Sequence, residues 1–266
     1  MHRLLSIAIA IFAIGMPYLA VADQPNALNQ KKDLFDFPAP ASQGEIKRLY
    51  ATRYYVHAVK IDKEQSASSL YSKSGKTLGI SISNEDFCFG ALQGTIRVQV
   101  DSAIEIYNAD GLAPVKSAVC SYKKLGSTVN EQLGRQAWVK VAGNAEFGLG
   151  VQGKRLIPFR TIAVDTKYTP IGTVFFIPKL RGWHFNDSGV ERVHDGYVIA
   201  GDKGGGIVGK THIDFFTGNY TGVPPDFVTS DPSGLFDAEI VSDKNVKDTL
   251  RNDSRYIPDA KSQDGP

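Results

Sequence analysis

The chain has 266 residues, of which 42% are hydrophobic and 10% aromatic, so it can bury a core and wholesale disorder is excluded. Its 30 Lys and Arg nearly balance its 28 Asp and Glu, which gives no electrostatic case for a nucleic-acid ligand or an anionic membrane surface. Two Cys are too few for a disulfide scaffold or a Cys-rich zinc site, and the length suits one domain with a sizeable insertion.

Residues 1–22 are strongly apolar and predict a secretory signal peptide. They begin with the basic pair His2-Arg3 and end with Ala20-Val21-Ala22, an A-x-A cleavage pattern. An uncleaved membrane anchor is the alternative, because an apolar stretch of this length can just span a bilayer. We expect cleavage, and therefore an exported protein, periplasmic or secreted, without a stable membrane anchor.

Residues 23–47 are polar and contain prolines, which predicts a flexible spacer. A β-rich run then begins near Arg48, and short strand-like segments follow between Gly, Asn, Asp and Pro. The predicted strands are Leu78–Ser83, Thr95–Val100, Ala137–Val141, Thr161–Val164, Thr173–Ile177, Gly196–Ala200, Ile207–Val208 and His212–Phe216. Many short strands without a long helical period favour a mainly β barrel or sandwich.

Two helices are predicted, one over Asn84–Leu92 with Asn84 as its cap and one near 233–251 in a C-terminal tail, 219–266. Cys88 and Cys120 are predicted to form a disulfide, because an exported protein meets an oxidising compartment. Two buried free thiols are the alternative, since sequence does not report the distance between them.

Three aspartates lie in apolar or glycine-rich settings. Asp165 follows a β-branched run, Asp202 follows Val198-Ile199-Ala200-Gly201, and Asp214 follows His212-Ile213. Burial penalises a carboxylate and raises its pKa, which is how a protein keeps a carboxylic acid able to donate a proton near neutral pH. The alternative for each one alone is a turn cap or an acceptor of backbone N–H groups.

Other chemistries fit the same segment less well. Gly204 to Thr211 satisfies the phosphate-loop pattern, but a strand follows where that loop requires a helix. The histidines do not have compact zinc-ligand spacing, and no metal or cofactor is expected. An aspartic-protease dyad is disfavoured because Lys203 interrupts the D-T-G pattern and no second copy exists.

Five separate pieces of sequence carry a resemblance to a known family. They are Ile162-Ala163-Val164-Asp165, Pro170-Ile171-Gly172-Thr173, His194-Asp195-Gly196-Tyr197, Gly201-Asp202-Lys203-Gly204-Gly205-Gly206 continuing to Gly209, and His212-Ile213-Asp214-Phe215-Phe216 continuing to Gly218. In this order they resemble the bacterial three-aspartate (3D) domain, which membrane-bound lytic transglycosylase A shares. The segment from Asp86 to Thr95 looks like one found upstream of that domain in secreted members.

The resemblance implies a double-psi β-barrel over residues 48–218, with an inserted second lobe at about 60–136. It also implies a peptidoglycan lytic transglycosylase, which cleaves between N-acetylmuramic acid and N-acetylglucosamine and leaves 1,6-anhydromuramyl ends. Asp214 corresponds to the family's acid/base, and Asp202 and Asp165 line the same site. We expect substrate contacts from Lys203, Gly204, Gly205, His212 and Tyr55; protein partners are not readable from the sequence.

Two positions depart from the family pattern. Lys203 stands where a small Thr is usual, and one extra residue lies between Gly209 and Asp214. Side chains alternate faces along a strand, so the extra residue turns Asp214 away unless a bulge or a longer turn absorbs it. A non-catalytic barrel that binds peptidoglycan or another glycan is therefore the alternative function.

Overall fold

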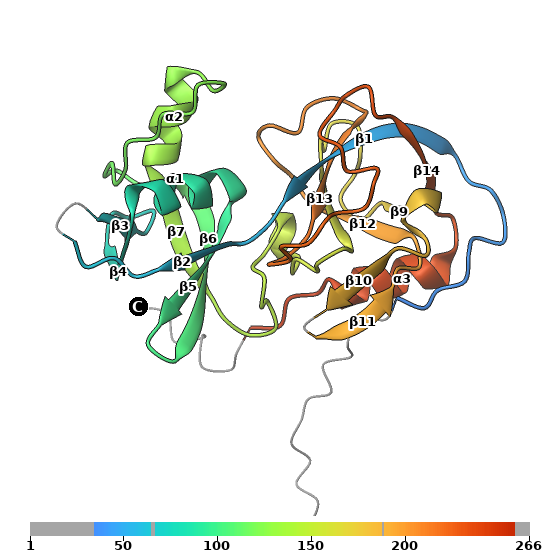
Figure 1. Ribbon diagram of the computed structural model, residues 1–266, viewed down its shortest axis with the longest axis horizontal. Coiled ribbons are helices and arrows are strands. Elements are labelled where there is room, and N and C mark those ends of the chain that lie inside the picture. The colour runs from blue at the N-terminus through green and yellow to red at the C-terminus, as the bar shows by residue number, and fades with distance from the viewer. Residues whose placement is uncertain (1–34, 65–66, 188, 259–266) are drawn as a thin grey trace, which may run out of the picture. The chain divides into compact units, whose positions relative to one another are not determined.

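The computed structural model describes residues 35–64, 67–187 and 189–258, which all belong to one unit of the chain, Asp33–Pro266 (Figure 1). The predicted signal peptide and residues 23–34 of the predicted spacer lie outside the described residues. The strands are β1 (Ile46–Tyr54), β2 (His57–Lys60), β3 (Ser68–Tyr71), β4 (Thr77–Ile82), β5 (Thr95–Val100), β6 (Ala103–Leu112), β7 (Gln136–Val141), β8 (Thr161–Val164), β9 (Val174–Phe176), β10 (His184–Asp187), β11 (Val190–Val193), β12 (Tyr197–Asp202), β13 (His212–Phe216) and β14 (Phe236–Ile240). The α-helices are α1 (Asn84–Gln93), α2 (Ser127–Gly134) and α3 (Lys244–Asp253). In this described part, no helix is long and apolar enough to cross a bilayer.

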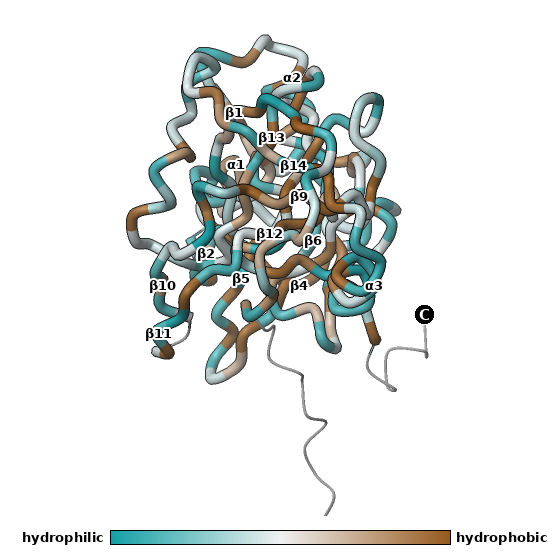
Figure 2. The backbone as a smooth tube through the Cα atoms, turned by 90° about the vertical axis from the view of Figure 1, so that its right-hand side faces the viewer, coloured by the Kyte–Doolittle hydropathy of each residue, from teal (hydrophilic) through white to brown (hydrophobic). Residues whose placement is uncertain are grey.

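Six strands close into a barrel in the order β1-β13-β8-β12-β9-β14. β1 runs parallel to β13 and β12 runs parallel to β8, and the other neighbours are antiparallel. Apolar side chains fill the interior, among them Ile162, Val198 and Phe215. Figure 2 shows hydrophobic stretches of chain around β9 and β12 and hydrophilic stretches in outer turns. The mainly β barrel is confirmed, and the double-psi connectivity stays a prediction.

The barrel extends beyond its predicted end at Gly218. β14 pairs with both β1 and β9 and so completes the closure of the barrel. Its residues Phe236 and Ala238 are buried in the barrel core. α3 follows, capped by the Asp243 carboxylate, which accepts from two backbone N–H groups, and it buries Val246 and Leu250. The predicted tail 219–266 is thus corrected: its middle part is a barrel strand and a packed helix.

A second sheet, β2-β5-β6-β7, lies between β1 and β8 in the sequence, together with the β3–β4 hairpin, α1 and α2. It has its own core, which includes Phe87, Ile96 and Trp138. This region runs from His57 to Val141 and contains the predicted insertion at about 60–136.

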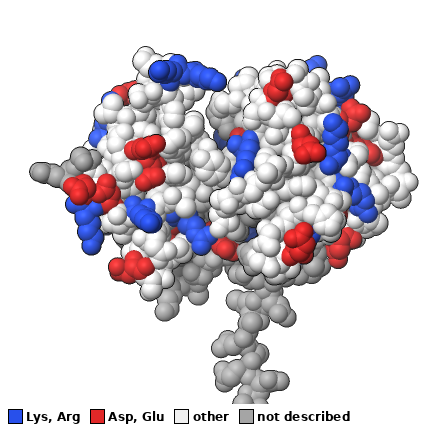
Figure 3. All heavy atoms as spheres, viewed as in Figure 1, with Lys and Arg blue, Asp and Glu red and all other residues white. Residues whose placement is uncertain are grey.

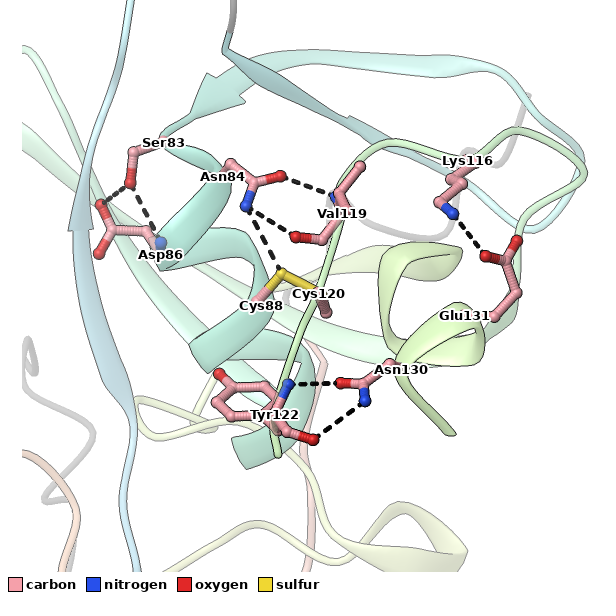
Figure 4. Close-up of a disulfide and its surroundings, with 10 residues drawn as sticks. All are labelled: Ser83, Asn84, Asp86, Cys88, Lys116, Val119, Cys120, Tyr122, Asn130 and Glu131. Atoms are coloured by element: carbon pink, nitrogen blue, oxygen red, sulfur yellow. Dashed lines mark hydrogen bonds and ion pairs between the residues drawn. A yellow bond between two sulfur atoms is a disulfide. The ribbon is translucent and has the colours of Figure 1, made fainter. Parts of the chain in front are cut away.

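The predicted disulfide is confirmed: Cys88 on α1 is bonded to Cys120 (Figure 4). Beside it, the Asn84 side-chain amide accepts from the N–H of Val119 at 2.7 Å and donates to its carbonyl at 3.0 Å. The covalent bond and the amide pair hold the same extended segment against α1. Ser83, and not Asn84 as predicted, is the helix cap, because its hydroxyl accepts from the Asp86 N–H.

Local patterns were misleading in a few other places. Ile207–Val208, predicted as a strand, lies in a loop in which Ile207 is buried without strand pairing. The sequence prediction missed β6, the β10–β11 hairpin and α2, whose exposed positions interrupt any apolar period.

The last residues of the predicted spacer pack against the barrel around a buried ion pair. Arg160, 1% exposed, donates to both Asp195 carboxylate oxygens at 2.5 and 2.7 Å. The Phe35 ring covers the guanidinium at 4.1 Å, and the Phe37 N–H donates to Asp195. The spacer boundary at residue 47 is therefore wrong: residues 35–38 are part of the folded unit, and β1 begins at Ile46.

Candidate active site

Asp214 lies on the outer face of the barrel. Along β13, Ile213 and Phe215 are buried in the barrel core, so His212, Asp214 and Phe216 point to the other side. β13 pairs with β1 and with β8 without a bulge, and Asp214 lies opposite Thr52. The extra residue expected before Asp214 therefore does not disturb the strand, and its place would be the loop that precedes His212.

A β-bulge turns Asp202 toward the same face. On β12, Ile199 and Ala200 pair with Thr161 and Ile162 of β8, and the register then skips Gly201 so that Asp202 pairs with Ala163. Without the skip, Gly201 would take that position and the Asp202 side chain would point to the opposite face. Bulges commonly re-aim a side chain in this way beside functional sites.

Ala163 is the partner of both aspartates, Asp214 on one side and Asp202 on the other. Neighbouring strands lie about 4.8 Å apart, so the two aspartate backbones are about 10 Å apart across β8. Directly paired residues point to the same face, and Ala163 between them is small and buried in a cluster with Tyr54 and Phe216. The three strands thus present two carboxyl groups to one site.

Both carboxyl groups have a raised pKa. Burial raises the pKa of Asp214 to about 6; the Thr52 hydroxyl lowers it and the negative charge of Asp202 raises it further. Burial likewise raises the pKa of Asp202 to about 6, against lowering contributions from the Lys203 N–H, the Tyr54 hydroxyl and the Val151 N–H. Two neighbouring carboxyls with raised pKa values can hold one proton between them in mildly acidic solution.

Thr52 connects Asp214 to His212. The Thr52 Oγ1 donates to Asp214 Oδ1 at 2.8 Å and lies 2.9 Å from His212 Nε2. A hydroxyl has one proton, so while Thr52 donates to Asp214 it must accept from a protonated Nε2. Burial lowers the pKa of His212, and the Tyr50 ring stacks on it at 4.5 Å. His212, predicted to contact substrate, is therefore also a support for Asp214.

Tyr54, like Thr52, is a residue that the sequence did not connect with the carboxyl pair. It is 7% exposed and packs on Phe216, and its buried hydroxyl has no hydrogen-bond partner of ordinary geometry within the described residues. Burial, together with the negative charges of Asp202 and Asp214, raises its pKa well above the usual value. Thr52 and Tyr54 are two positions apart in the first β-rich run, which predicts that their side chains share one face of the strand. Nothing in the sequence indicates that this face lies beside Asp214.

The Tyr54 hydroxyl is expected to favour the ionised form of Asp202 and, through that charge, the protonated form of Asp214. We predict that Tyr54→Phe raises the pKa of Asp202, so that Asp202 is less often ionised and stabilises the protonated form of Asp214 less. Glycan cleavage at pH 7 should fall about tenfold, and the alkaline limb of its pH profile should move to lower pH. Tyr107→Phe, which removes a hydroxyl bonded to Glu105 in the second sheet, is the matched control. An unshifted pH profile in Tyr54→Phe would contradict this assignment.

Asp165, the third predicted aspartate, makes backbone contacts between loops. Its carboxylate accepts from the Gly209 N–H at 2.9 Å and from the Lys167 N–H at 3.0 Å, and these bonds lower its pKa. Asp165 is not among the groups that shift the pKa of Asp202 or Asp214. It holds two loops together through these bonds, and its expected place in the same site as Asp202 and Asp214 stays a prediction.

The glycine-rich loop runs from Lys203 to Thr211 and leads into a strand. Lys203, Gly204 and Gly205 are exposed, and the Lys203 N–H donates to Asp202. Because β13 and not a helix follows, the loop lacks the helix N-terminus that the phosphate-loop pattern needs. Tyr55 is half-buried, with the Arg53 guanidinium 5.9 Å from its ring.

The motif pair His194-Asp195 is buried and hydrogen-bonded within the fold. His194 is fully buried; its Nε2 lies 2.8 Å from the Phe159 carbonyl, and its Nδ1 accepts from the Gly196 N–H. Burial lowers its pKa to about 3, so it stays neutral. In the described part of the chain, no group of three or more His, Cys, Asp or Glu side chains is arranged to hold a metal ion.

Gly150 allows the turn after β7 to reach Asp202. A Cβ at this position would lie 2.4 Å from the Gly201 carbonyl oxygen and 3.2 Å from the Asp202 Cβ. We predict that Gly150→Ala displaces the bulge, costs about 1–3 kcal/mol of unfolding free energy and reduces glycan cleavage at least tenfold. Gly126→Ala, where no atom lies within 4 Å, should keep wild-type activity. Denaturant titration and a cleavage assay check both variants.

Comparison with known proteins gives one family match and a similarity of fold. Residues 160–223 match the 3D domain family, and no curated protein matches the sequence. The solved structure of a membrane-bound lytic murein transglycosylase from Agrobacterium tumefaciens aligns with a TM-score of 0.51 at 15% identity, over 79% of each chain. MltA from E. coli with bound chitohexaose aligns with a TM-score of 0.48 at 14% identity, over 73% of this chain and 71% of that one. The alignment with the A. tumefaciens structure establishes a shared fold.

Proposed function

Because the chain contains a 3D domain over residues 160–223, we propose that it is a peptidoglycan lytic transglycosylase that cleaves between N-acetylmuramic acid and N-acetylglucosamine. The observation that carries the proposal is the Asp202–Ala163–Asp214 alignment, which presents two half-buried carboxyl groups to one face. The fold shared with the A. tumefaciens enzyme supports it.

Asp214 is assigned both proton transfers. In its protonated form it gives its proton to the glycosidic oxygen, and the bond from that oxygen to C1 of the muramyl sugar breaks with the electron pair going to the oxygen. The C6 hydroxyl of the same sugar then bonds to C1, and the Asp214 carboxylate takes the hydroxyl proton. No water is consumed, and Asp214 returns to its starting state. A second carboxylate, Asp202, stabilises the oxocarbenium-like charge at C1.

The alternative function is a glycan-binding barrel without catalysis. It is favoured by Lys203, whose positive charge lies beside Asp202 and lowers its pKa. An ionised Asp202 still supports the protonated form of Asp214, so the lysine is compatible with either function. The two functions differ in whether product forms.

Digestion of purified sacculi with the mature protein, followed by mass spectrometry of the fragments, tests the proposal. The expected products carry 1,6-anhydromuramyl ends, and they should be absent with Asp214→Asn. Binding to sacculi without product, equal in wild type and Asp214→Asn, would establish the binding module instead.

We further propose that the protein acts outside the cytoplasm, in the periplasm or as a secreted enzyme, with peptidoglycan strands as its partner. The Cys88–Cys120 disulfide supports this location, since disulfides persist in oxidising compartments. Figure 3 shows acidic and basic side chains interspersed over the face in view, which suits a substrate bound by stacking and hydrogen bonds.

A further inference from the structure

A separate pocket of about 350 Å³ lies where the first half of β1 faces the loops that follow β8 and precede β13. Its lining residues include three cations, Lys47, Arg48 and Lys210, and no acid. Tyr168 and Ile46, 59% and 42% exposed, add an apolar wall. The pocket thus combines positive charge with surface for alkyl groups.

The three cations are available to a ligand. Lys47 contacts Glu45, and Arg48 pairs with Asp237 at 3.1 Å, but both pairs are exposed and such pairs contribute little. Lys210 makes no ion pair or hydrogen bond through its side chain to any residue in 35–64, 67–187 or 189–258. An anion entering the pocket therefore displaces no strong internal partner.

Asp165 connects the two loops that line the pocket. Its side chain binds the Gly209 N–H, next to Lys210, and its carbonyl accepts from the Tyr168 N–H. One residue thus ties the loop that carries Tyr168 to the loop that carries Lys210. This gives the third aspartate a role in assembling a binding surface, apart from the chemistry at Asp202 and Asp214.

The pocket reaches the face of the carboxyl pair through Arg48, while its residues Leu49 and Phe175 belong to the barrel core. Arg48, Tyr50 and Thr52 alternate on one side of β1, and two residues span about 6.7 Å, so Arg48 is about 13 Å from Thr52 and its partner Asp214. The stacked rings of Tyr50 and His212 occupy the space between them. An extended peptide covers about 3.3 Å per residue, so a peptide of three or four residues bridges this distance.

We propose that this pocket binds the carboxylates of the stem peptide attached to the muramyl sugar, and that the enzyme therefore prefers peptide-bearing glycan to bare glycan. The inference rests on the proposed function and deepens it. A neutral glycan alone needs no cluster of three cations, whereas the stem peptide supplies carboxylates and alkyl side chains at the required distance.

The test compares kcat/KM on two substrates: glycan strands with intact stem peptides, and the same strands stripped by an amidase. The expected result is a preference of the wild type for peptide-bearing strands that weakens as salt rises. Lys210→Glu should lower this preference about three- to tenfold, mainly through KM. Lys76→Glu, the same charge change in an exposed turn between β3 and β4, should keep it.

The failures are distinguishable. Cleavage of both substrates with equal kcat/KM, or equal behaviour of Lys210→Glu and Lys76→Glu, would overturn the pocket assignment and leave the transglycosylase intact. No cleavage of either substrate would overturn the proposed function. Binding of a muramyl tetrapeptide to Asp214→Asn, compared with its carboxyl-amidated form, is a second measurement that needs no turnover; equal affinities would also overturn the assignment.

Discussion

Asp214→Asn is expected to reduce the formation of anhydromuramyl ends by about 10²- to 10⁴-fold while making the protein more stable at neutral pH. Asn keeps an oxygen that can accept from the Thr52 hydroxyl, but it can neither give nor take a proton. The rate loss therefore reports the acid/base role. Mass spectrometry of sacculus digests over a time course measures it.

The gain in stability follows from the raised pKa. A carboxyl with a pKa of about 6 in the folded state and about 3.9 when unfolded contributes full stability below pH 4, and this contribution is lost as pH rises through 6. At pH 8 the buried carboxylate thus costs about 2–3 kcal/mol, which Asn removes. Urea unfolding of both proteins at pH 4 and pH 8 checks this expectation.

These two readouts separate chemistry from folding. An inactive Asp214→Asn that is also less stable at pH 8 would place Asp214 in a structural role. Wild-type activity in the variant would exclude it as the acid. For the wild type, activity should fall as pH rises through about 6, because Asp214 must begin protonated.

Arg160→Met is expected to destabilise the protein by about 3–5 kcal/mol, the largest loss among the variants considered. The substitution leaves the Asp195 carboxylate, 4% exposed, without the guanidinium that now lowers its pKa despite burial. The bonds from the N–H groups of Phe37 and Tyr197 remain and compensate only in part. Denaturant titration at neutral pH measures the change.

The double variant Arg160→Met with Asp195→Leu should recover much of this loss, since removing both partners leaves no uncompensated charge. Lys244→Met, which breaks the exposed pair with Asp248, should change stability by less than about 1 kcal/mol. Equal effects of Arg160→Met and Lys244→Met would show that the buried pair is not a major determinant of stability.

Much of the barrel could be predicted from local pattern. Two barrel strands, Thr161–Val164 and His212–Phe216, have the boundaries that their apolar and alternating residues predict, and so does Thr95–Val100 in the second sheet. β14 could not be found in this way, because the strand has only five residues and several of them are partly exposed. These residues form a strand only because they pair with β1 and β9. Barrel closure is a long-range property that no local window contains.

For the candidate site, the sequence indicates which residues take part, and the fold determines which of them lie beside one another. The residue pattern alone predicted an exported, nearly neutral, mainly β protein with a 3D motif, and it named Asp202 and Asp214, because side-chain type and strand alternation are local information. Only the tertiary structure decided that a bulge at Gly201 brings Asp202 level with Asp214, that Thr52 and Tyr54 adjoin them, and that Asp165 ties loops. The physical reason is that burial and strand register join residues up to about 160 positions apart, and these contacts set both the carboxyl pKa values and the face to which each side chain points.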